Sequence, residues 1–479
     1  MATTLVFGIV AASTGLWEKV KTIESTDDET LSGSCAVSGD GNYAAVVVGT
    51  NIATYRLDNN EWSLFGSIPK DSSLDSSAVF GHSMSFSNDG SRLAVGVDIA
   101  AFSSGRAFVY ARGPSDWTLE HTITPTVLGT LLGGVTSGGQ FGSDVALASD
   151  GASLLVSAPT ATYNTIFSND GYPLSAYCGT VQKYTLSASP WSQRADVGAN
   201  DADWPKVAST HFTGYDVHCD RFGHSVALSS DGTYFAIGSP RFEQGAASEP
   251  QGRVYVPGVD LYGSAANDQL GLDLAMSDDG LFVAAGSNAG YVRTYKKDGD
   301  AWTDLVTYED TSPGRDTGFG RNVAMSGNGL RLAIIAPAHG DLTGRVIVYA
   351  RSTTDDVWTV ETTIAEGTNI EGDDRPNYIQ MSFDGRSLIV GDGDARIVRG
   401  YGDLPDVSGT TNAPPTNAPP TNAPSSDDKL SGGALAGIIV GSVAGAALFG
   451  VGVYQYRKQM AAKKVNPARI PRSNQCLPC

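Results

Sequence analysis

The sequence predicts an all-β fold, a seven-bladed β-propeller of four-stranded antiparallel blades, followed by one C-terminal transmembrane helix. Three observations predict it: a hairpin pattern that occurs seven times, a spacing from Tyr to Trp that marks two further strands, and an uncharged run near the C-terminus. The chain has 479 residues, of which 57 are glycines, 41% are hydrophobic and 17% are charged. That composition suits a globular all-β protein rich in tight turns.

The hairpin pattern is an alternating apolar stretch, an Asp-Gly or Asn-Gly pair, and a second apolar stretch, as in 222–238. Alternation with a period of two predicts strands. Asp-Gly and Asn-Gly tolerate the positive φ that a tight hairpin turn requires. Each copy is therefore expected to be a β-hairpin. The seven pairs are Asp40-Gly41, Asp89-Gly90, Asp150-Gly151, Asp231-Gly232, Asp279-Gly280, Asn328-Gly329 and Asp384-Gly385.

A second marker predicts the third and fourth strands of each unit. A Tyr near the end of one strand is followed seven positions later by a Trp at the start of the next; the pair Tyr349 and Trp358 is longer by two, and in the fourth copy Tyr255 is followed by Tyr262. Four short strands at a spacing of roughly 50 residues are typical of propeller blades. The regular pairs are Tyr55 and Trp62, Tyr110 and Trp117, Tyr184 and Trp191, and Tyr295 and Trp302.

The seventh copy lacks a fourth strand, because a proline-rich stretch follows Tyr401. At the other end of the chain, Val10 and Trp17 stand in the Tyr-to-Trp spacing and 19–23 follow. We therefore expect the N-terminal segment to pair with the strand around Ile397 and to close the ring. A closed ring removes exposed sheet edges, which invite aggregation.

The repeated residues resemble a known family. The pattern Phe-Gly-x-Ser-Val-Ala-Leu-Ser, Asp-Gly, Ile-Gly-Ser-Pro and Gly-Arg-Val-Tyr is similar to the FG-GAP repeat of integrin α-subunit-type propellers, over about residues 5–402. Phe-Gly stands at Phe80, Phe141, Phe222 and Phe319, and Leu270-Gly271 is a weaker form. Blades of that family often hold calcium in a longer acidic loop. The loops here are too short to supply six oxygens, so we expect turn roles for these aspartates and no metal site.

The C-terminal part is expected to cross a membrane. Residues 1–402 form the predicted ectodomain, and 403–431 repeat Thr-Asn-Ala-Pro-Pro, which favours a stiff stalk. Residues 432–454 carry no charge, and as a helix they span about 34 Å, enough for a bilayer. The tail, 455–479, is basic, so the positive-inside rule predicts a cytoplasmic C-terminus and an extracellular or lumenal propeller.

Two features of this part leave alternatives open. Residues 1–13 are a poor signal peptide: either the signal is shortened, or the gene start is incomplete, or the span itself directs insertion. Within the span, glycines recur every four residues, which on a helix forms a groove for helix–helix packing and a homodimer; the alternative is a generic span of small residues. These glycines are Gly433, Gly437, Gly441 and Gly445.

Composition and motifs argue against two classes of function. The net charge of −19 makes nucleic acid an unfavourable partner. The chain has no nucleophile elbow, phosphate-binding glycine loop, zinc helix or dinucleotide fingerprint. His82 and His224 occupy one repeat position where other copies have Ser143, Leu272 and Arg321, which favours a structural role. We therefore predict that the protein is not an enzyme and has no cofactor.

Candidate ligand residues lie in the third repeat, where insertions at about 160–178 and 194–221 lengthen the unit. In a four-strand meander these two connections emerge on the same face, so we expect them to be neighbours. Aromatic side chains beside carboxylates suit stacking on sugars or contact with a basic protein loop; alternatively, the aromatic residues only anchor long loops. The candidates are Tyr172, Tyr177, Trp204, His211, Tyr215, Asp216 and His218.

Cys178 and Cys219 each end one insertion just before a strand begins. We predict a disulfide between them, which would persist outside the cell. Together these features favour a cell-surface adhesion or recognition protein that binds a protein or glycan ligand through the loop face. The alternatives are a membrane-tethered polysaccharide hydrolase or lyase and a purely structural surface protein.

Overall fold

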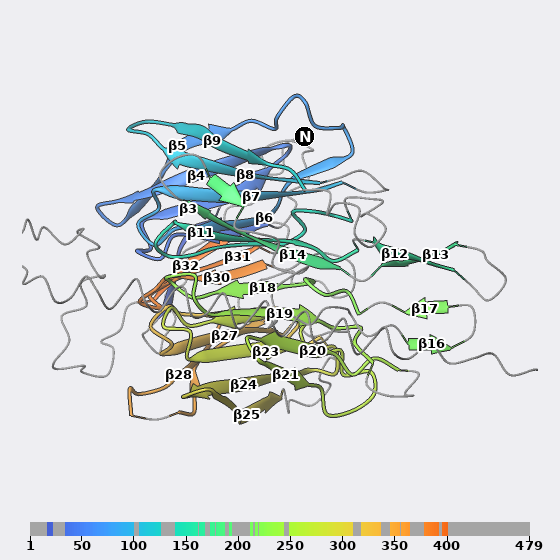
Figure 1. The fold of residues 1–479 in the computed structure, drawn as a ribbon. Coiled ribbons are helices and arrows are strands. Elements are labelled where there is room, and N and C mark those ends of the chain that lie inside the picture. The colour runs from blue at the N-terminus through green and yellow to red at the C-terminus, as the bar shows by residue number, and fades with distance from the viewer. Residues whose placement is uncertain are drawn as a thin grey trace, which may run out of the picture. The chain divides into compact units, whose positions relative to one another are not determined.

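The computed structural model describes residues 17–22, 34–99, 105–125, 139–160, 162–167, 173–177, 179–186, 191–193, 211–213, 216–218, 220–243, 249–309, 318–336, 345–354, 356–364, 378–391 and 395–400. All of them belong to the first of two compact units, Met1–Ser408 and Gly409–Cys479. The described residues form an all-β propeller (Figure 1).

The first blades follow the chain in simple order. Blade 1 consists of β2 (Cys35–Val37), β3 (Tyr43–Val48), β4 (Asn51–Asp58) and β5 (Glu61–Ile68). Blade 2 consists of β6 (Ala78–Phe86), β7 (Arg92–Ile99), β8 (Arg106–Arg112) and β9 (Trp117–Ile123). Blade 3 consists of β10 (Val145–Leu147), β11 (Ser153–Ala158), β14 (Thr180–Leu186) and β15 (Trp191–Gln193), and it carries additional strands described below.

The other blades repeat this four-stranded antiparallel order. Blade 4 consists of β18 (Val226–Leu228), β19 (Phe235–Ser239), β20 (Arg253–Val256) and β21 (Val259–Tyr262). Blade 5 consists of β22 (Leu274–Met276), β23 (Phe282–Gly286), β24 (Tyr291–Asp298) and β25 (Ala301–Glu309). Blade 6 consists of β26 (Val323–Met325), β27 (Arg331–Ala336), β28 (Arg345–Ala350) and β29 (Thr359–Ile364). Blade 7 consists of β30 (Tyr378–Met381), β31 (Ser387–Gly391), β32 (Ala395–Gly400) and β1 (Trp17–Thr22).

The N-terminal strand completes blade 7, as the sequence predicted. Strand β1 pairs antiparallel with β32, with Lys21 opposite Ile397 and Trp17 opposite Gly400. The Trp17 side chain is only 6% exposed and packs with the core of blades 6 and 7. The Arg331 guanidinium lies 5.6 Å from the centre of the Trp17 ring. Val10, the other residue of the predicted marker, lies outside the described residues.

The innermost strands form a closed ring, in which β2 contacts both β6 and β30. A second ring of backbone hydrogen bonds joins the turns that follow these strands, one from each blade to the next. Such bonds give every inter-blade boundary a directional contact in addition to apolar packing. The seven bonds run from N to O between Asp40 and Asn88 (2.7 Å), Asn88 and Ser149 (2.8 Å), Asp150 and Ser230 (3.1 Å), Ser230 and Asp278 (2.8 Å), Asp278 and Gly327 (2.8 Å), Asn328 and Phe383 (3.0 Å), and Phe383 and Gly39 (2.7 Å).

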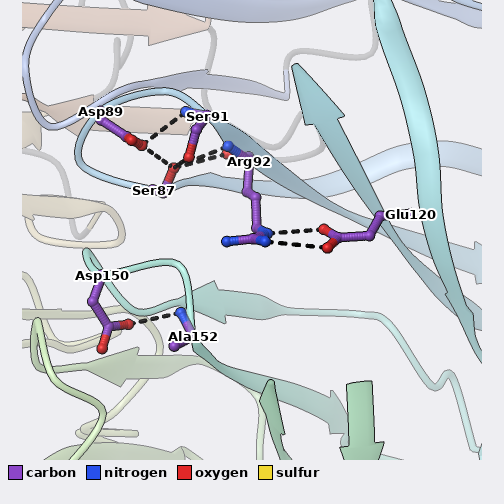
Figure 2. A network of polar contacts seen from close by, with 7 residues as sticks. All are labelled: Ser87, Asp89, Ser91, Arg92, Glu120, Asp150 and Ala152. Carbon is purple, nitrogen blue, oxygen red and sulfur yellow. Dashed lines mark hydrogen bonds and ion pairs between the residues drawn. The ribbon is translucent and has the colours of Figure 1, made fainter. Parts of the chain in front are cut away.

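The Asp-Gly pairs form the predicted turns. In blade 2, the Ser87 hydroxyl donates to Asp89 Oδ1 at 2.9 Å, and the same oxygen accepts the Ser91 N–H at 2.9 Å (Figure 2). The Arg92 N–H donates to Ser87 Oγ at 3.0 Å, and Gly90 has φ +62°. A side-chain oxygen that accepts an N–H two residues ahead is a standard way to fix a turn. The turn role predicted for these acidic residues is therefore confirmed.

The Phe-Gly pairs pack one blade against another. Phe80, Phe141 and Phe319 are almost completely buried. Gly142, after Phe141, has φ +89°, and a Cβ atom there would lie 2.3 Å from the carbonyl oxygen of Arg106 in blade 2. Only glycine satisfies both the conformation and the close approach. The Phe-Gly repeat is thus explained by inter-blade packing.

The Trp residues of the outer strands also contact the preceding blade. Trp117 Nε1 donates to Thr54 Oγ1 in blade 1 at 2.9 Å. The N–H of Trp358, in blade 6, donates to the Tyr308 hydroxyl in blade 5 at 3.0 Å. The predicted Tyr-to-Trp marker therefore coincides with the third and fourth strands and with a recurring contact between blades.

Candidate functional site

Two β-hairpins occupy the predicted insertions. Strands β12 (Thr162–Phe167) and β13 (Pro173–Tyr177) pair between β11 and β14, and β16 (His211–Thr213) and β17 (Asp216–His218) pair between β15 and β18. Strand β13 contacts β17, so the two insertions are neighbours, as predicted (Figure 1). The sequence predicted only loops in both segments, so these hairpins were not predicted. We call the two hairpins together the insertion hairpins.

The structure places four of the candidate ligand residues on the insertion hairpins. His211 pairs with His218 in the backbone register, and Asp216 pairs with Thr213. Tyr177 is the last residue of β13. Tyr172, Trp204 and Tyr215, and both cysteines of the predicted disulfide, Cys178 and Cys219, lie outside the described residues.

The second candidate site is a cavity of about 460 Å³ lined by the innermost strands. The cavity exists because most blades place a small side chain four residues before the Asp or Asn of the turn. The residues at this position are Ala36, Ser85, Ala146, Ala227, Ala275, Ala324 and Gln380. Gln380 is the only large one of the seven. Its Nε2 donates to the carbonyl oxygen of Met84 at 2.8 Å, and its Oε1 accepts the N–H of Val37 at 3.3 Å.

One end of the cavity carries a row of polar residues, each six positions before the turn residue: Asp144, Ser225, Asp273 and Asn322. Asp144 Oδ2 accepts the N–H of Val226 in blade 4 at 2.7 Å, and Asp273 Oδ2 accepts the N–H of Val323 in blade 6 at 2.8 Å. The Ser225 hydroxyl donates to Asp273 Oδ1 at 3.3 Å. These side chains therefore connect blades 3 to 6.

Burial raises the pKa of Asp144 to about 7, and the nearby Asp273 carboxylate adds to the shift. Burial also raises the pKa of Asp273 to about 6. At His224, burial and the positive charges of Arg221 and Arg241 lower the pKa to about 4. The carboxyls therefore exchange protons near neutral pH, whereas the imidazole stays neutral there.

The other end of the cavity, next to the turns, carries Asp278, Ser149 and Asn88. The Ser149 hydroxyl donates to Asp278 Oδ2 at 2.8 Å. Burial raises the pKa of Asp278 to about 6, and the neighbouring Asp279 carboxylate contributes. The cavity thus has carboxyl groups at both ends.

Sequence reasoning missed the carboxyl pair of Asp144 and Asp273, although a signal was present. Both residues are the fourth of a Phe-Gly-x-Asp or Leu-Gly-x-Asp copy, where other copies have Ser83, Ser225 or Asn322. When the copies are aligned with one another, Asp144 and Asp273 are acidic at a position that faces the cavity. Among the described residues, no group of three or more His, Cys, Asp or Glu side chains is placed to hold a metal ion.

The predicted span, 432–454, and its four glycines lie outside the described residues, as do the stalk and the tail. Within the part of the chain that the structure describes, no helix has the length and apolar character needed to cross a membrane.

Comparison with known proteins assigns no family. The sequence matches no protein-family model, and no curated protein matches it. A chain from a crystal structure of a mitotic checkpoint complex matches over 83% of this chain and 100% of its own length, at 15% identity and a TM-score of 0.46. The β-propeller domain of Myceliophteria thermophila Cps50 (Swd1) matches over 80% of this chain and 99% of its own, at 9% identity and a TM-score of 0.47.

Proposed function

We propose that this protein is a cell-surface adhesion or recognition protein that binds a protein or glycan ligand through the insertion hairpins. The observation that carries the proposal is the contact between β13 and β17, which brings together two insertions that are far apart in the sequence. Binding residues are commonly found on segments that a rigid scaffold holds in place. Here the scaffold is the ring of blades, and only blade 3 and its connection to blade 4 carry additional hairpins among the described residues.

The finer parts of the proposal rest on the sequence. The inter-blade packing of the Phe-Gly pairs supports a propeller of the FG-GAP type. The uncharged run 432–454, followed by a basic tail, supports a single-pass protein with an extracellular or lumenal propeller and a cytoplasmic C-terminus. The glycine spacing in the run supports a homodimer through the span.

The test is a glycan and protein array probed with the full-length chain in a mild detergent. We expect binding that is lost in the double variant His211→Ala and His218→Ala. A matched control is Asp298→Asn, at the exposed tip of the hairpin between β24 and β25. Equal binding by both variants would move the ligand site away from the insertion hairpins. The absence of any ligand on the array would favour a purely structural surface protein.

The proposed disulfide between Cys178 and Cys219 would fasten the base of the insertion hairpins. Its support is a close backbone approach: a Cβ atom on Gly179 would lie 2.1 Å from the carbonyl oxygen of Phe222. The residue after one cysteine therefore lies against a residue near the other. Peptide mass mapping of protein secreted or displayed by cells should find the linked pair, and two free thiols would refute it.

A second candidate function is a membrane-tethered polysaccharide hydrolase or lyase. It is favoured by one observation, the two cavity carboxyls of Asp144 and Asp273 whose pKa values are raised to about 7 and about 6. A pair of carboxyls with shifted pKa values suits general acid–base work. A screen of polysaccharides for new reducing ends or unsaturated products tests it, and activity must disappear in Asp144→Asn. Against it, both carboxylates already accept backbone N–H groups and hold blades together.

A further inference from the structure

The central cavity has a composition that the proposed function leaves unexplained. Five of the seven positions four residues before the turn contribute Ala or Ser to its wall, which leaves a space of about 460 Å³ between the blades. Volumes of about 300–1,000 Å³ are typical of sites for small molecules. Between its two polar ends, the wall includes the small apolar residues Ala146, Ala227 and Ala275.

The polar groups of the cavity favour a ligand that donates hydrogen bonds and carries positive charge. Asp144 and Asp273 lie at one end and Asp278 at the other, and none of the described lining residues is Lys or Arg.

Asp144 retains capacity for a ligand although it also joins two blades, whereas the Asp273 carboxylate already accepts hydrogen bonds from Leu274, Val323 and Ser225. Asp144 accepts the N–H groups of Val145 and Val226, one on each oxygen, at 2.9 and 2.7 Å. A carboxylate has about four acceptor sites. The side chains are half-buried, and their accessible surface belongs to the cavity wall. A cation in the cavity would therefore meet charge that no side chain on the wall neutralises.

We propose that this cavity binds a linear organic polyamine, with an ammonium group at Asp144 and Asp273, the aliphatic chain along the apolar wall, and a second ammonium group at Asp278. The distance between the two ends supports a long molecule. Asp273 and Asp278 are five residues apart on one inner strand and its turn, which allows a separation of at most about 16 Å at a rise of about 3.3 Å per residue. A short monoamine reaches only one end. A metal ion would use only one end and leave the apolar wall without a contact.

The test is calorimetric titration of the full-length chain at pH 8 and low salt, with spermine as the probe. We expect saturable binding of one spermine, at least tenfold weaker binding in the double variant Asp144→Asn and Asp273→Asn, and no binding of tetraethylene glycol. Butylamine should bind at least tenfold more weakly than spermine. Since the whole chain is acidic, the charge-matched control is Asp298→Asn with Asp300→Asn, on an exposed hairpin, and it should bind as the wild type does.

Three results would overturn the proposal. The first is that the cavity and hairpin double variants weaken spermine binding equally, and the second is that tetraethylene glycol binds as tightly as spermine. The third is that calcium chloride binds in the cavity while spermine does not. If the cavity double variant fails to fold, by circular dichroism, the single variant Asp278→Asn decides. At least fivefold weaker spermine binding in Asp278→Asn supports the proposal, and unchanged binding refutes it. The array result for the insertion hairpins is independent of this outcome, since it is decided by variants of His211 and His218 and this titration by variants of Asp144, Asp273 and Asp278.

Discussion

Gln380 in blade 7 donates a hydrogen bond from Nε2 to the carbonyl oxygen of Met84 in blade 2, at 2.8 Å. The inner strand of blade 1 lies between these two residues in the ring, and the same Gln380 side chain accepts the N–H of Val37 from that strand. The amide therefore ties three blades together at the place where the two ends of the chain meet. In the other six blades the corresponding residue is Ala or Ser.

The first prediction concerns this amide. Gln380→Ala introduces a residue that fits the ring, so it removes two hydrogen bonds without steric conflict. Because the N–H of Val37 and the carbonyl of Met84 lose a partner, we expect the free energy of unfolding to fall by about 1–3 kcal/mol. Urea denaturation of the full-length chain measures the change. A loss smaller than about 0.5 kcal/mol, comparable to a neutral surface substitution, would show that water replaces the amide at no cost.

The second prediction compares two glycines in turns of blade 5. Gly280 and Gly299 both have positive φ, +69° and +59°. A Cβ atom at Gly280 would lie 2.5 Å from Tyr234 Cδ2 in blade 4, whereas one at Gly299 meets no atom within 4 Å. Gly299→Ala should therefore cost only the backbone strain, about 1 kcal/mol, and Gly280→Ala at least about 1 kcal/mol more. Equal thermal destabilisation of the two variants would contradict the assigned inter-blade contact.

The third prediction concerns two ion pairs at the same position of different blades. Arg92 and Arg331 each begin a second strand and bind a Glu on the outer strand through Nε and Nη2, Glu120 at 2.8 and 3.1 Å and Glu361 at 2.8 and 2.6 Å; Figure 2 shows the first pair. The side chains of Arg92 and Glu120 are 26% and 22% exposed, and those of Arg331 and Glu361 are 5% and 11% exposed. Double-mutant cycles should give a coupling energy of about 0.5–1 kcal/mol for the first pair and a larger one for the second.

The coupling energies of the two ion pairs should also differ in their dependence on salt concentration. The coupling between Arg92 and Glu120 should fall when ionic strength is raised to 1 M, because solvent reaches the pair and screens it. The coupling between Arg331 and Glu361 should change little, since burial excludes the screening ions. Equal salt dependence of the two coupling energies would show that burial does not control them.

Much of the fold follows from local sequence signals. Asp-Gly and Asn-Gly pairs identify the turn because the positive φ at Gly and the side-chain acceptor act within four residues. The closure of the ring was also predictable. Trp17 occupies the position that marks an outer strand, but the other strands of that blade are not found near the N-terminus. Both signals arise from a requirement of the backbone that few residue types meet.

The candidate sites were harder to predict, for a physical reason. The spacing of Asp144 and Asp273 along the chain says nothing about their proximity, which arises only when blades 3 to 5 form an arc of the ring. The hairpin formed by His211–Thr213 and Asp216–His218 was also missed, since strands of three residues are too short to show alternation. The contact between the insertions was predictable, because meander topology alone sends both connections to one face.

The final prediction is the pH dependence of stability. The pKa values of Asp144, Asp273 and Asp278 are raised by burial to about 7, 6 and 6, above their unfolded value of 3.8. The folded state therefore binds more protons than the unfolded state between about pH 7 and 4, so stability should rise as pH falls through this window. His224 opposes the trend below pH 6.5, since its pKa is lowered to about 4 and its neutral form is the one that the folded protein holds.

The clearest window is therefore from pH 8 to 6.5, where the carboxyls take up protons and the imidazole contributes little. We expect the urea midpoint to increase over this interval, by an amount equivalent to roughly 1 kcal/mol, because the half-buried carboxyls are partly solvated in the cavity. Asp144→Asn should flatten the increase, and Asp298→Asn on the exposed hairpin should leave it unchanged. A midpoint that falls from pH 8 to 6.5 in the wild type would show that the folded protein stabilises the carboxylates as anions. In that case the cavity would not need a bound cation to compensate their charge.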